Sequence, residues 1–379
     1  MHVVVLGGGY AGLTLTRLLE SDLPDDAELT LVDRTPDHLV QHELHRVIRR
    51  PELAGAITVS LPAVLERATV RVATVEKIDR QERVVSLSNG GLEYDLLAIC
   101  LGARTAYYGL EGVREHAIPL KRLRHANRIR KRTREICYDG SDDSRIVVGG
   151  AGLSGIQVAG ELAELVREER SPETEITLLE QRESVAPSFP SNFQRAVREK
   201  LEAKGIGVRT QATVREATDE HVVLESEETV PYDEFVWTGG IRGPDPLEGE
   251  RPTVESDLRL DDRTFVLGDA ARVVDGEEEF VPASAQSAVR EARTVATNVT
   301  RVVERELEGD GMIDLESFTF DTPGWLVSVG DDAVAQVGPA VVTGRSAKAL
   351  KSTVGLGYLS SVGATGTALG RIREEFDPR

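Results

Sequence analysis

The chain has 379 residues, with 64 acids and 45 bases, which gives a formal charge of −19 at neutral pH. The length predicts two or three domains with ample cores, and the acid excess argues against nucleic acid as a partner, because no basic stripe balances it. The bases are mostly arginine, a composition that suits a halophilic cell interior, where salt screens self-repulsion; an ordinary acidic protein is the alternative.

Cysteine usage and hydropathy predict a cytoplasmic protein. The two cysteines, Cys100 and Cys137, lie far apart, which argues for a reducing compartment and against a disulfide framework. The apolar start ends in glycines and is too short for a signal peptide, and no apolar run reaches the ~18 residues of a membrane span.

The first predicted elements are a strand, a glycine-rich turn and a helix. Residues 2–6 are apolar and lead into a GxGxxG fingerprint, followed by a helical pattern over 11–20. The glycines permit a tight turn, let the backbone approach a pyrophosphate and let helix pack on strand, and the free N–H groups of the helix bind phosphate. The next strand, 29–32, ends at Asp33, near the offset of a ribose-binding carboxylate. The fingerprint residues are Gly7, Gly8, Gly9, Tyr10, Ala11 and Gly12.

The rest of the first half is predicted to complete an α/β domain. A helical stretch is expected over 42–49, and the last strand of this half ends at Gly102. The chain then crosses over between about 112 and 144, where the arginine- and lysine-rich stretch 121–134 is interpreted as a solvated helix face. Strands are expected over 70–78, 84–88 and 94–101.

A second fingerprint repeats this plan. The apolar strand 145–149 leads into another GxGxxG and a helix over 156–168, and the strand 176–179 ends at Glu180. A carboxylate there repels a 2′-phosphate and favours NADH over NADPH, although the nearby Arg182 leaves NADPH open. Two complete fingerprints imply that one protein holds two nucleotides. The second set of glycines is Gly150, Gly152 and Gly155, and further elements are expected at 192–204 (helix), 207–210, 221–225 and 234–238 (strands).

The last part of the chain is predicted to return to the first domain and then form a tail. A strand over 264–269 and a helix over 285–308 precede a polar break at 309–311 and alternating apolar residues over 326–337. The glycine-rich tail, 345–373, is expected to be helical, and its apolar stripe is interpreted as core, with a weak membrane face or a dimer face as alternatives. That stripe comprises Ala347, Leu350, Val354, Tyr358 and Val362.

This layout resembles the two-dinucleotide-binding flavoprotein reductases, the FAD-dependent pyridine nucleotide oxidoreductases. The resemblance rests on the first fingerprint and on the stretches 97–102, 237–240 and 264–269. It implies an α/β fold with two Rossmann-like domains, the NADH domain being inserted in a split FAD domain, and a small C-terminal α+β region. The implied boundaries are 1–112 and 251–310 for FAD, 113–250 for NADH and 311–379 for the C-terminal region.

The resemblance also implies which residues bind the cofactors FAD and NADH. The first loop would hold FAD, the second NADH, and Asp269 would hydrogen-bond the ribityl chain. No metal is expected. The spacing of His38 and His42 would put them on one helix face, but these two and His45 form no HExxH motif. A loop that packs near the FAD is the better interpretation of this histidine-containing segment. The implied cofactor-binding residues are Gly7, Gly8, Gly9, Tyr10, Ala11, Gly12, Asp33, Arg34, Val75, Gly102, Gly268, Asp269, Ala285, Gly150, Gly152, Gly155, Glu180 and Gly239.

Within the family, the chain is most similar to the type II NADH dehydrogenases, which pass electrons from flavin directly to a membrane quinone. It has no redox cysteine pair after the first fingerprint, and Cys100 is interpreted as inert core. Similar stretches occur at 115–121, 159–164 and 282–288, although Arg290 replaces the last glutamine of the quinone pattern AQxAxQ.

The implied reaction is hydride transfer from NADH to FAD, which requires no protein acid or base. Glu161 maps onto a family carboxylate near the nicotinamide and flavin, with a solvated helix acid as the alternative. Gln286 and Ala285 map onto the acceptor side, where the helix N-terminus would point at the flavin. A soluble reductase for ferredoxin or another acceptor, and a redox sensor without turnover, are the other functional hypotheses; a homodimer and peripheral contact with the inner face of the cell membrane are left open.

Overall fold

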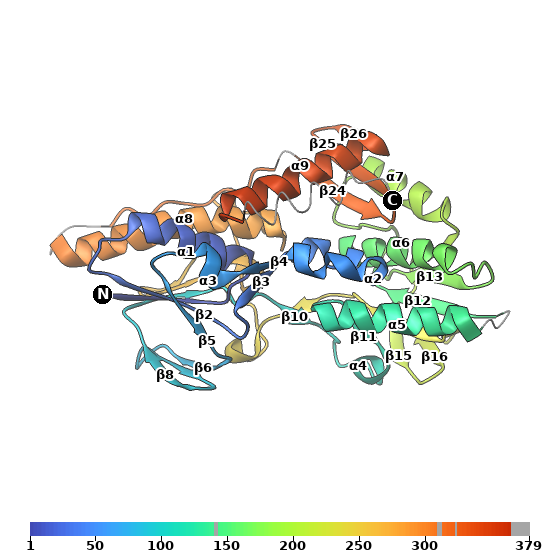
Figure 1. The fold of residues 1–379 in the computed structure, drawn as a ribbon, viewed down its shortest axis with the longest axis horizontal. Coiled ribbons are helices and arrows are strands. Elements are labelled where there is room, and N and C mark those ends of the chain that lie inside the picture. The colour runs from blue at the N-terminus through green and yellow to red at the C-terminus, as the bar shows by residue number, and fades with distance from the viewer. Residues whose placement is uncertain (140–142, 309–312, 323, 365–379) are drawn as a thin grey trace.

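The computed structural model describes residues 1–139, 143–308, 313–322 and 324–364. Figure 1 shows two lobes side by side, each built around a sheet, with a long helix, α9 (Arg345–Ser361), running across the top of both. Among the described residues, no helix has the length and apolar character needed to cross a membrane.

The first lobe contains a six-stranded sheet that draws on both ends of the chain. Its strand order is β21-β22-β9-β1-β2-β5, and all neighbours are parallel except β21 and β22. Residues Val3 to Leu6 are almost fully buried, as expected of a parallel strand covered on both faces. On one face α1 (Tyr10–Asp22) packs along α8 (Ala285–Glu308). The strands are β1 (His2–Leu6), β2 (Glu28–Asp33), β5 (Thr69–Val72), β9 (Leu96–Ile99), β21 (Arg259–Asp261) and β22 (Thr264–Val266).

The second lobe contains a five-stranded parallel sheet of order β11-β18-β12-β13-β14. A third region, next to α6 and α7, is a three-stranded antiparallel sheet on which α9 packs. The second sheet comprises β11 (Ile118–Pro119), β12 (Arg145–Gly149), β13 (Glu175–Leu179), β14 (Ile206–Arg209) and β18 (Glu234–Trp237), and its helices are α5 (Leu123–Asp139), α6 (Leu153–Glu168) and α7 (Ser191–Glu202). The third comprises β24 (Gly324–Val329), β25 (Asp332–Val337) and β26 (Ala340–Thr343).

Short elements connect these layers. The helices are α2 (Arg46–Arg49), α3 (Leu61–Val64) and α4 (Val113–His116), with 3₁₀ turns at Gln41–Glu43, Pro51–Ile57, Asp245–Leu247 and Gly268–Ala270. The strands are β3 (Asp37–Leu39), β4 (Thr58–Ser60), β6 (Val75–Asp79), β7 (Val84–Leu87), β8 (Gly90–Glu93), β10 (Arg104–Thr105), β15 (Val214–Ala217), β16 (His221–Leu224), β17 (Thr229–Pro231), β19 (Ile241–Arg242), β20 (Thr253–Val254) and β23 (Arg272–Val273).

One local prediction is wrong, and two features are changed in detail. The single strand over 70–78 is two strands in different sheets: β5 ends at Val72, paired with β2, and β6 begins at Val75, paired with β7. The helical stretch 42–49 is a 3₁₀ turn followed by one turn of α-helix, and His38 lies in β3 rather than on a helix face with His42. In each case the local pattern is outweighed by contacts with distant residues.

The tail is helical as predicted, and its stripe is largely core. Ala347 and Val362 are buried and Tyr358 is half-buried, whereas Leu350 is 37% exposed. The side chain of Val354, the polar break 309–311 and the tail beyond 364 lie outside the described residues.

The first residue of β18, Glu234, is a buried carboxyl group. Its Oε2 lies 2.7 Å from Thr133 Oγ1, which also lies 3.0 Å from the carbonyl of Ile129. One hydroxyl hydrogen cannot serve both acceptors, so the second bond requires a protonated Glu234 that donates to Thr133. Consistently, burial raises the pKa of Glu234 to about 8.

This raised pKa predicts a pH-dependent stability. The folded protein holds the proton that the unfolded chain releases above its ordinary pKa of 4.5, so the contribution of Glu234 to stability falls as the pH rises from about 4.5 to about 8. Glu234→Gln keeps a donor to Thr133 and is expected to be more stable at pH 8 by on the order of 3 kcal/mol, with little gain at pH 5. Urea unfolding at both pH values measures this, with Glu199→Gln on the exposed side of α7 as the control; a wild-type pH slope in Glu234→Gln would contradict it.

Candidate functional site

The first glycine loop has the geometry that its sequence predicts. Gly7 has a φ of +103°, and a Cβ there would lie 2.4 Å from the carbonyl oxygen of Cys100. A Cβ on Gly12 would lie 1.8 Å from the carbonyl oxygen of Gly7, so the helix packs on the strand only without a side chain. A Cβ on Gly9 would meet nothing within 4 Å, which leaves the approach to the N-terminus of α1 open.

The second loop repeats this geometry. Gly150 has a φ of +94°, and its Cβ would lie 2.7 Å from the Cα of Gly239. A Cβ on Gly155 would lie 1.8 Å from the carbonyl oxygen of Gly150, whereas one on Gly152 would meet nothing within 4 Å. The two loops are therefore matched sites, each with an open face at a helix N-terminus.

A carboxylate at the end of the adjacent strand holds each loop. The N–H of Gly8 donates to Asp33 Oδ2 at 2.7 Å, and that of Ala151 donates to Glu180 Oε2 at 2.8 Å. The other oxygen accepts from the backbone N–H two residues on, Thr35 in one case and Arg182 in the other. Asp33 Oδ1 also accepts from Thr35 Oγ1 at 3.1 Å, whereas Asp33 Oδ2 and both Glu180 oxygens each accept one bond and retain a lone pair, so both carboxylates can still accept a ribose hydroxyl.

After the second lobe the chain returns to the first lobe. There the predicted second FAD motif, residues 264–269, lies against the first loop. Gly268 has a φ of +66°, and its Cβ would lie 3.2 Å from that of Ala11 and 3.5 Å from that of Ala288 in α8. The N–H of Gly268 donates to the buried Glu291 at 2.6 Å, and burial raises the pKa of Glu291 to about 7. Asp269 is half-buried beside it. Residues 11, 268 and 288 thus meet at one place, although they are far apart in the sequence.

Beside the first loop lies an arginine cluster that was only partly predicted. Arg34 follows Asp33 directly, and burial and the other three arginines lower the pKa of Arg122 to about 10. Arg104 lies 3.9 Å from Asp245, and a diphosphate would supply further negative charge to the cluster. The sequence indicated only Arg34 of these four arginines, because the stretch 121–134 was interpreted as a solvated helix face. That interpretation is correct for Lys131, whose side chain is 76% exposed. The cluster consists of Arg34, Arg104, Arg122 and Arg124.

The predicted acceptor side lies at the start of α8, where Ala285 is the first helical residue. The Gln286 amide lies 2.8 Å from Thr322 Oγ1. With its oxygen turned toward Arg290, the amide also accepts from that guanidinium at 2.8 Å. The arginine that replaces the family's glutamine therefore contacts Gln286 directly.

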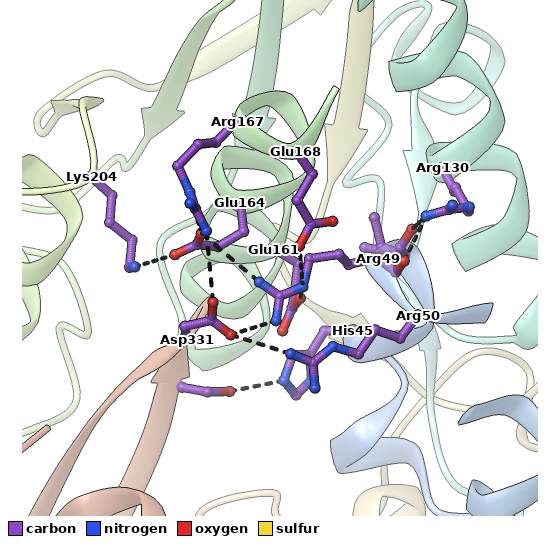
Figure 2. A network of polar contacts seen from close by, with 12 residues as sticks. His45, Arg49, Arg50, Arg130, Glu161, Glu164, Arg167, Glu168, Lys204 and Asp331 are labelled. Atoms are coloured by element: carbon purple, nitrogen blue, oxygen red, sulfur yellow. Dashed lines mark hydrogen bonds and ion pairs between the residues drawn. The ribbon is translucent and has the colours of Figure 1, made fainter. Parts of the chain in front are cut away.

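Glu161 is not a solvated acid. It is 2% exposed and lies 3.3 Å from the Arg49 guanidinium, inside the polar network of Figure 2. Arg49 comes from α2 and also reaches Asp331 at 2.5 Å, in the turn between β24 and β25. The solvated alternative is wrong because a distant segment supplies the partner. Other members of the network are Arg50, Glu164, Arg167, Glu168 and Lys204.

The remaining predicted residues fall into two groups. Gly102 and Gly239 follow the strands that flank the two loops, whereas Val75 is buried in the separate sheet β6-β7-β8. Cys100 is buried as predicted, and burial raises the pKa of its thiol well above the ordinary value, so it is inert.

Comparison with known proteins gives consistent relatives. A curated type II NADH:quinone oxidoreductase from Staphylococcus aureus is 26% identical over an alignment of 396 positions, which covers 97% of each chain. The solved structure of NDH2 from Plasmodium falciparum in complex with NADH superposes with a TM-score of 0.83 at 15% identity, over 99% of this chain and 98% of that one. The sulfide:quinone oxidoreductase of Aquifex aeolicus gives 0.77 at 18% identity, over 99% and 95%.

The shared fold is thus that of a flavoprotein reductase with two dinucleotide-binding lobes, as the sequence predicted. A family model described as pyridine nucleotide-disulphide oxidoreductase matches residues 1–292, which contain both glycine loops and the Gly268 motif. The chain belongs to the pyridine nucleotide-disulphide oxidoreductase family.

Proposed function

We propose that the protein is a type II NADH:quinone oxidoreductase that uses FAD. The proposal rests on the pair of matched loops. Each loop has a glycine with open space around it, Gly9 in the first and Gly152 in the second, and a carboxylate that accepts a hydrogen bond from the loop backbone. The curated relatives that cover 97% of the chain carry this name. The buried thiol of Cys100 argues against a sulfide or disulfide reductase, in which a reactive cysteine would be needed near the flavin.

The residues of the first lobe would bind and orient FAD. The open N-terminus of α1 at Gly9 is suited to the pyrophosphate, Asp33 to the adenosine ribose and Asp269 to the ribityl chain, and the arginine cluster offsets the phosphate charge. When bound, FAD supplies the ring that accepts a hydride from NADH and passes electrons on. The residues of the chain contribute orientation and electrostatics to this reaction.

The second loop would bind NADH, and the start of α8 would face the acceptor. Ala285 and Gln286 are the acceptor-side residues, and the guanidinium of Arg290 beside Gln286 offers a donor to a quinone oxygen. Glu161 is proposed to act from within its ion network in the middle of α6 rather than as a free acid. Because a quinone acceptor resides in the bilayer, peripheral contact with the inner face of the cell membrane is part of the proposal, and dimer formation stays a prediction.

The proposed domain boundaries follow the sheets. The six-stranded sheet takes its strands from residues 2–99 and 259–266, and the five-stranded sheet takes its strands from 118–237. These ranges support an FAD domain of 1–112 and 251–310, an NADH domain of 113–250 and a C-terminal region from 311 onward.

Glu180→Ala is expected to raise the KM for NADH about tenfold, because a hydrogen bond to a charged group is lost. It should also narrow the preference for NADH over NADPH, since the carboxylate no longer repels a 2′-phosphate. Steady-state kinetics with both nucleotides measure this. Asp33→Ala, the matched change in the first loop, is expected to leave the KM for NADH of the flavin-loaded protein unchanged, and unaltered kinetics in Glu180→Ala would refute the role of the second loop.

The acceptor is tested by NADH oxidation with a short-chain quinone, with ferredoxin and with oxygen, in high salt. The proposal predicts that the quinone gives the highest kcat/KM. A higher value with ferredoxin would favour a soluble reductase, and no turnover with any acceptor would favour a redox sensor; either result contradicts the proposed function.

A further inference from the structure

Polar contacts from β3 and α2 connect the segment that follows the first loop to the C-terminal region. The ring of His38 contacts the hydroxyl of Tyr358 at 3.0 Å, that of His45 contacts Ser328 at 2.8 Å, and Arg49 contacts Asp331 at 2.5 Å. The first of these reaches the loop itself, because His38 Nδ1 lies 2.9 Å from the carbonyl oxygen of Gly8.

The direction of these hydrogen bonds follows from their partners. A carbonyl oxygen only accepts, so His38 carries its proton on Nδ1 and donates to Gly8. Nε2 is then an acceptor, and the hydroxyl of Tyr358 donates to it. Burial lowers the pKa of His38 to about 4, so the ring is neutral at physiological pH and this arrangement persists.

The Gly8 carbonyl belongs to the same peptide group as the N–H of Gly9. In a planar trans peptide the C=O and N–H point in opposite directions, so a hydrogen bond to the carbonyl fixes the direction of the Gly9 N–H. Gly9 is the glycine with the open outer face, where the phosphate is proposed to bind. Tyr358 also packs on the loop directly, with its ring centroid 4.8 Å from that of Tyr10.

The second loop provides an internal comparison. Its equivalent carbonyl, on Ala151, accepts from the backbone N–H of Ala186 at 2.8 Å. That donor comes from the same lobe and involves neither a side chain nor the C-terminal region. The two loops are thus alike in their glycines and carboxylates but differ in what holds this one carbonyl.

We propose that Tyr358 is a positioning residue for FAD: through His38 it orients the Gly8–Gly9 peptide, so the affinity for FAD depends on the C-terminal helix α9, whereas the affinity for NADH does not. The inference rests on the proposed function only in taking FAD as the occupant of the first loop. Burial raises the pKa of Tyr358, which keeps its hydroxyl protonated as the required donor.

Tyr358→Phe tests the proposal, because it removes the hydroxyl and keeps the ring. Apoprotein is reconstituted with FAD, and flavin fluorescence gives the dissociation constant; the variant is expected to bind FAD about tenfold more weakly. NADH binding to the flavin-loaded protein should be unchanged. Tyr138→Phe, at a tyrosine that is 91% exposed on α5, is the matched control and should bind FAD like wild type.

A second variant separates positioning from a general loss of stability. His38→Leu removes the donor to Gly8 without altering α9, and should weaken FAD binding at least as much, while Tyr358→Phe in that background adds nothing further. The thermal midpoint of Tyr358→Phe should fall more in the FAD-loaded protein than in the apoprotein. An unchanged FAD dissociation constant in both single variants, or fully additive effects, would overturn the proposal, whereas wild-type protein that binds no FAD would instead refute the proposed function.

Discussion

Gly9→Val is expected to give folded protein that carries no flavin. Gly9 has extended backbone angles, φ −74° and ψ −164°, that a β-branched residue adopts readily, and its Cβ would meet nothing within 4 Å. The side chain would occupy the approach to the N-terminus of α1. Loss of two or more hydrogen bonds to charged phosphate should weaken FAD binding by about a hundredfold or more.

Gly152→Val is the matched variant in the second loop. Gly152 has φ −70° and ψ 179° and equally open surroundings, so this variant should fold, retain its flavin and fail to be reduced by NADH. Circular dichroism, the flavin content of the purified proteins and anaerobic reduction by NADH measure the pair. A yellow Gly9→Val or a colourless Gly152→Val would show that the assignment of the two loops is wrong.

Arg49→Met is expected to destabilise the protein by about 3–5 kcal/mol, the usual cost of leaving a buried charge without its partner. The Arg49 side chain is 3% exposed and faces acids from two other segments, Glu161 on α6 and Asp331 in the C-terminal sheet (Figure 2). Methionine fills a similar volume but removes the positive charge that faces Glu161, Glu164 and Asp331. Because Arg49 and Glu161 are buried, high salt should not remove the effect.

Urea unfolding in low and high salt measures this loss. Arg167→Met is the control, since Arg167 contacts Glu164 and Asp331 from the surface at 69% exposure and should matter little. Equal losses for the two arginines would show that burial does not decide the strength of the network.

Local sequence was sufficient to predict the two loops, because the strand, the glycine turn and the helix that form each loop are consecutive in the chain, even though Gly7 and Gly150 also lie against the distant Cys100 and Gly239. Gly7 must have a positive φ, and Gly12 must lie against Gly7, whatever surrounds them. The long helix over 285–308 was predicted to the residue, since its apolar periodicity is continuous.

Residues whose partners come from distant segments were not predictable in the same way. The position of Glu161 along its helix gives no sign of Arg49, which lies more than a hundred residues earlier in the chain. The contact of Tyr358 with His38 spans 320 residues, and neither sequence position indicates the other. The arginine cluster was missed for the same reason: only the fold brings Arg104 and Arg122 next to Arg34.

The most direct test of the two-cofactor account is an anaerobic titration of the purified wild-type protein with NADH, followed by a quinone. The account predicts a yellow protein whose flavin absorbance is lost with a stoichiometric amount of NADH and restored by the quinone. A flavin that stays oxidised in excess NADH, or a reduced flavin that the quinone does not reoxidise, would contradict it.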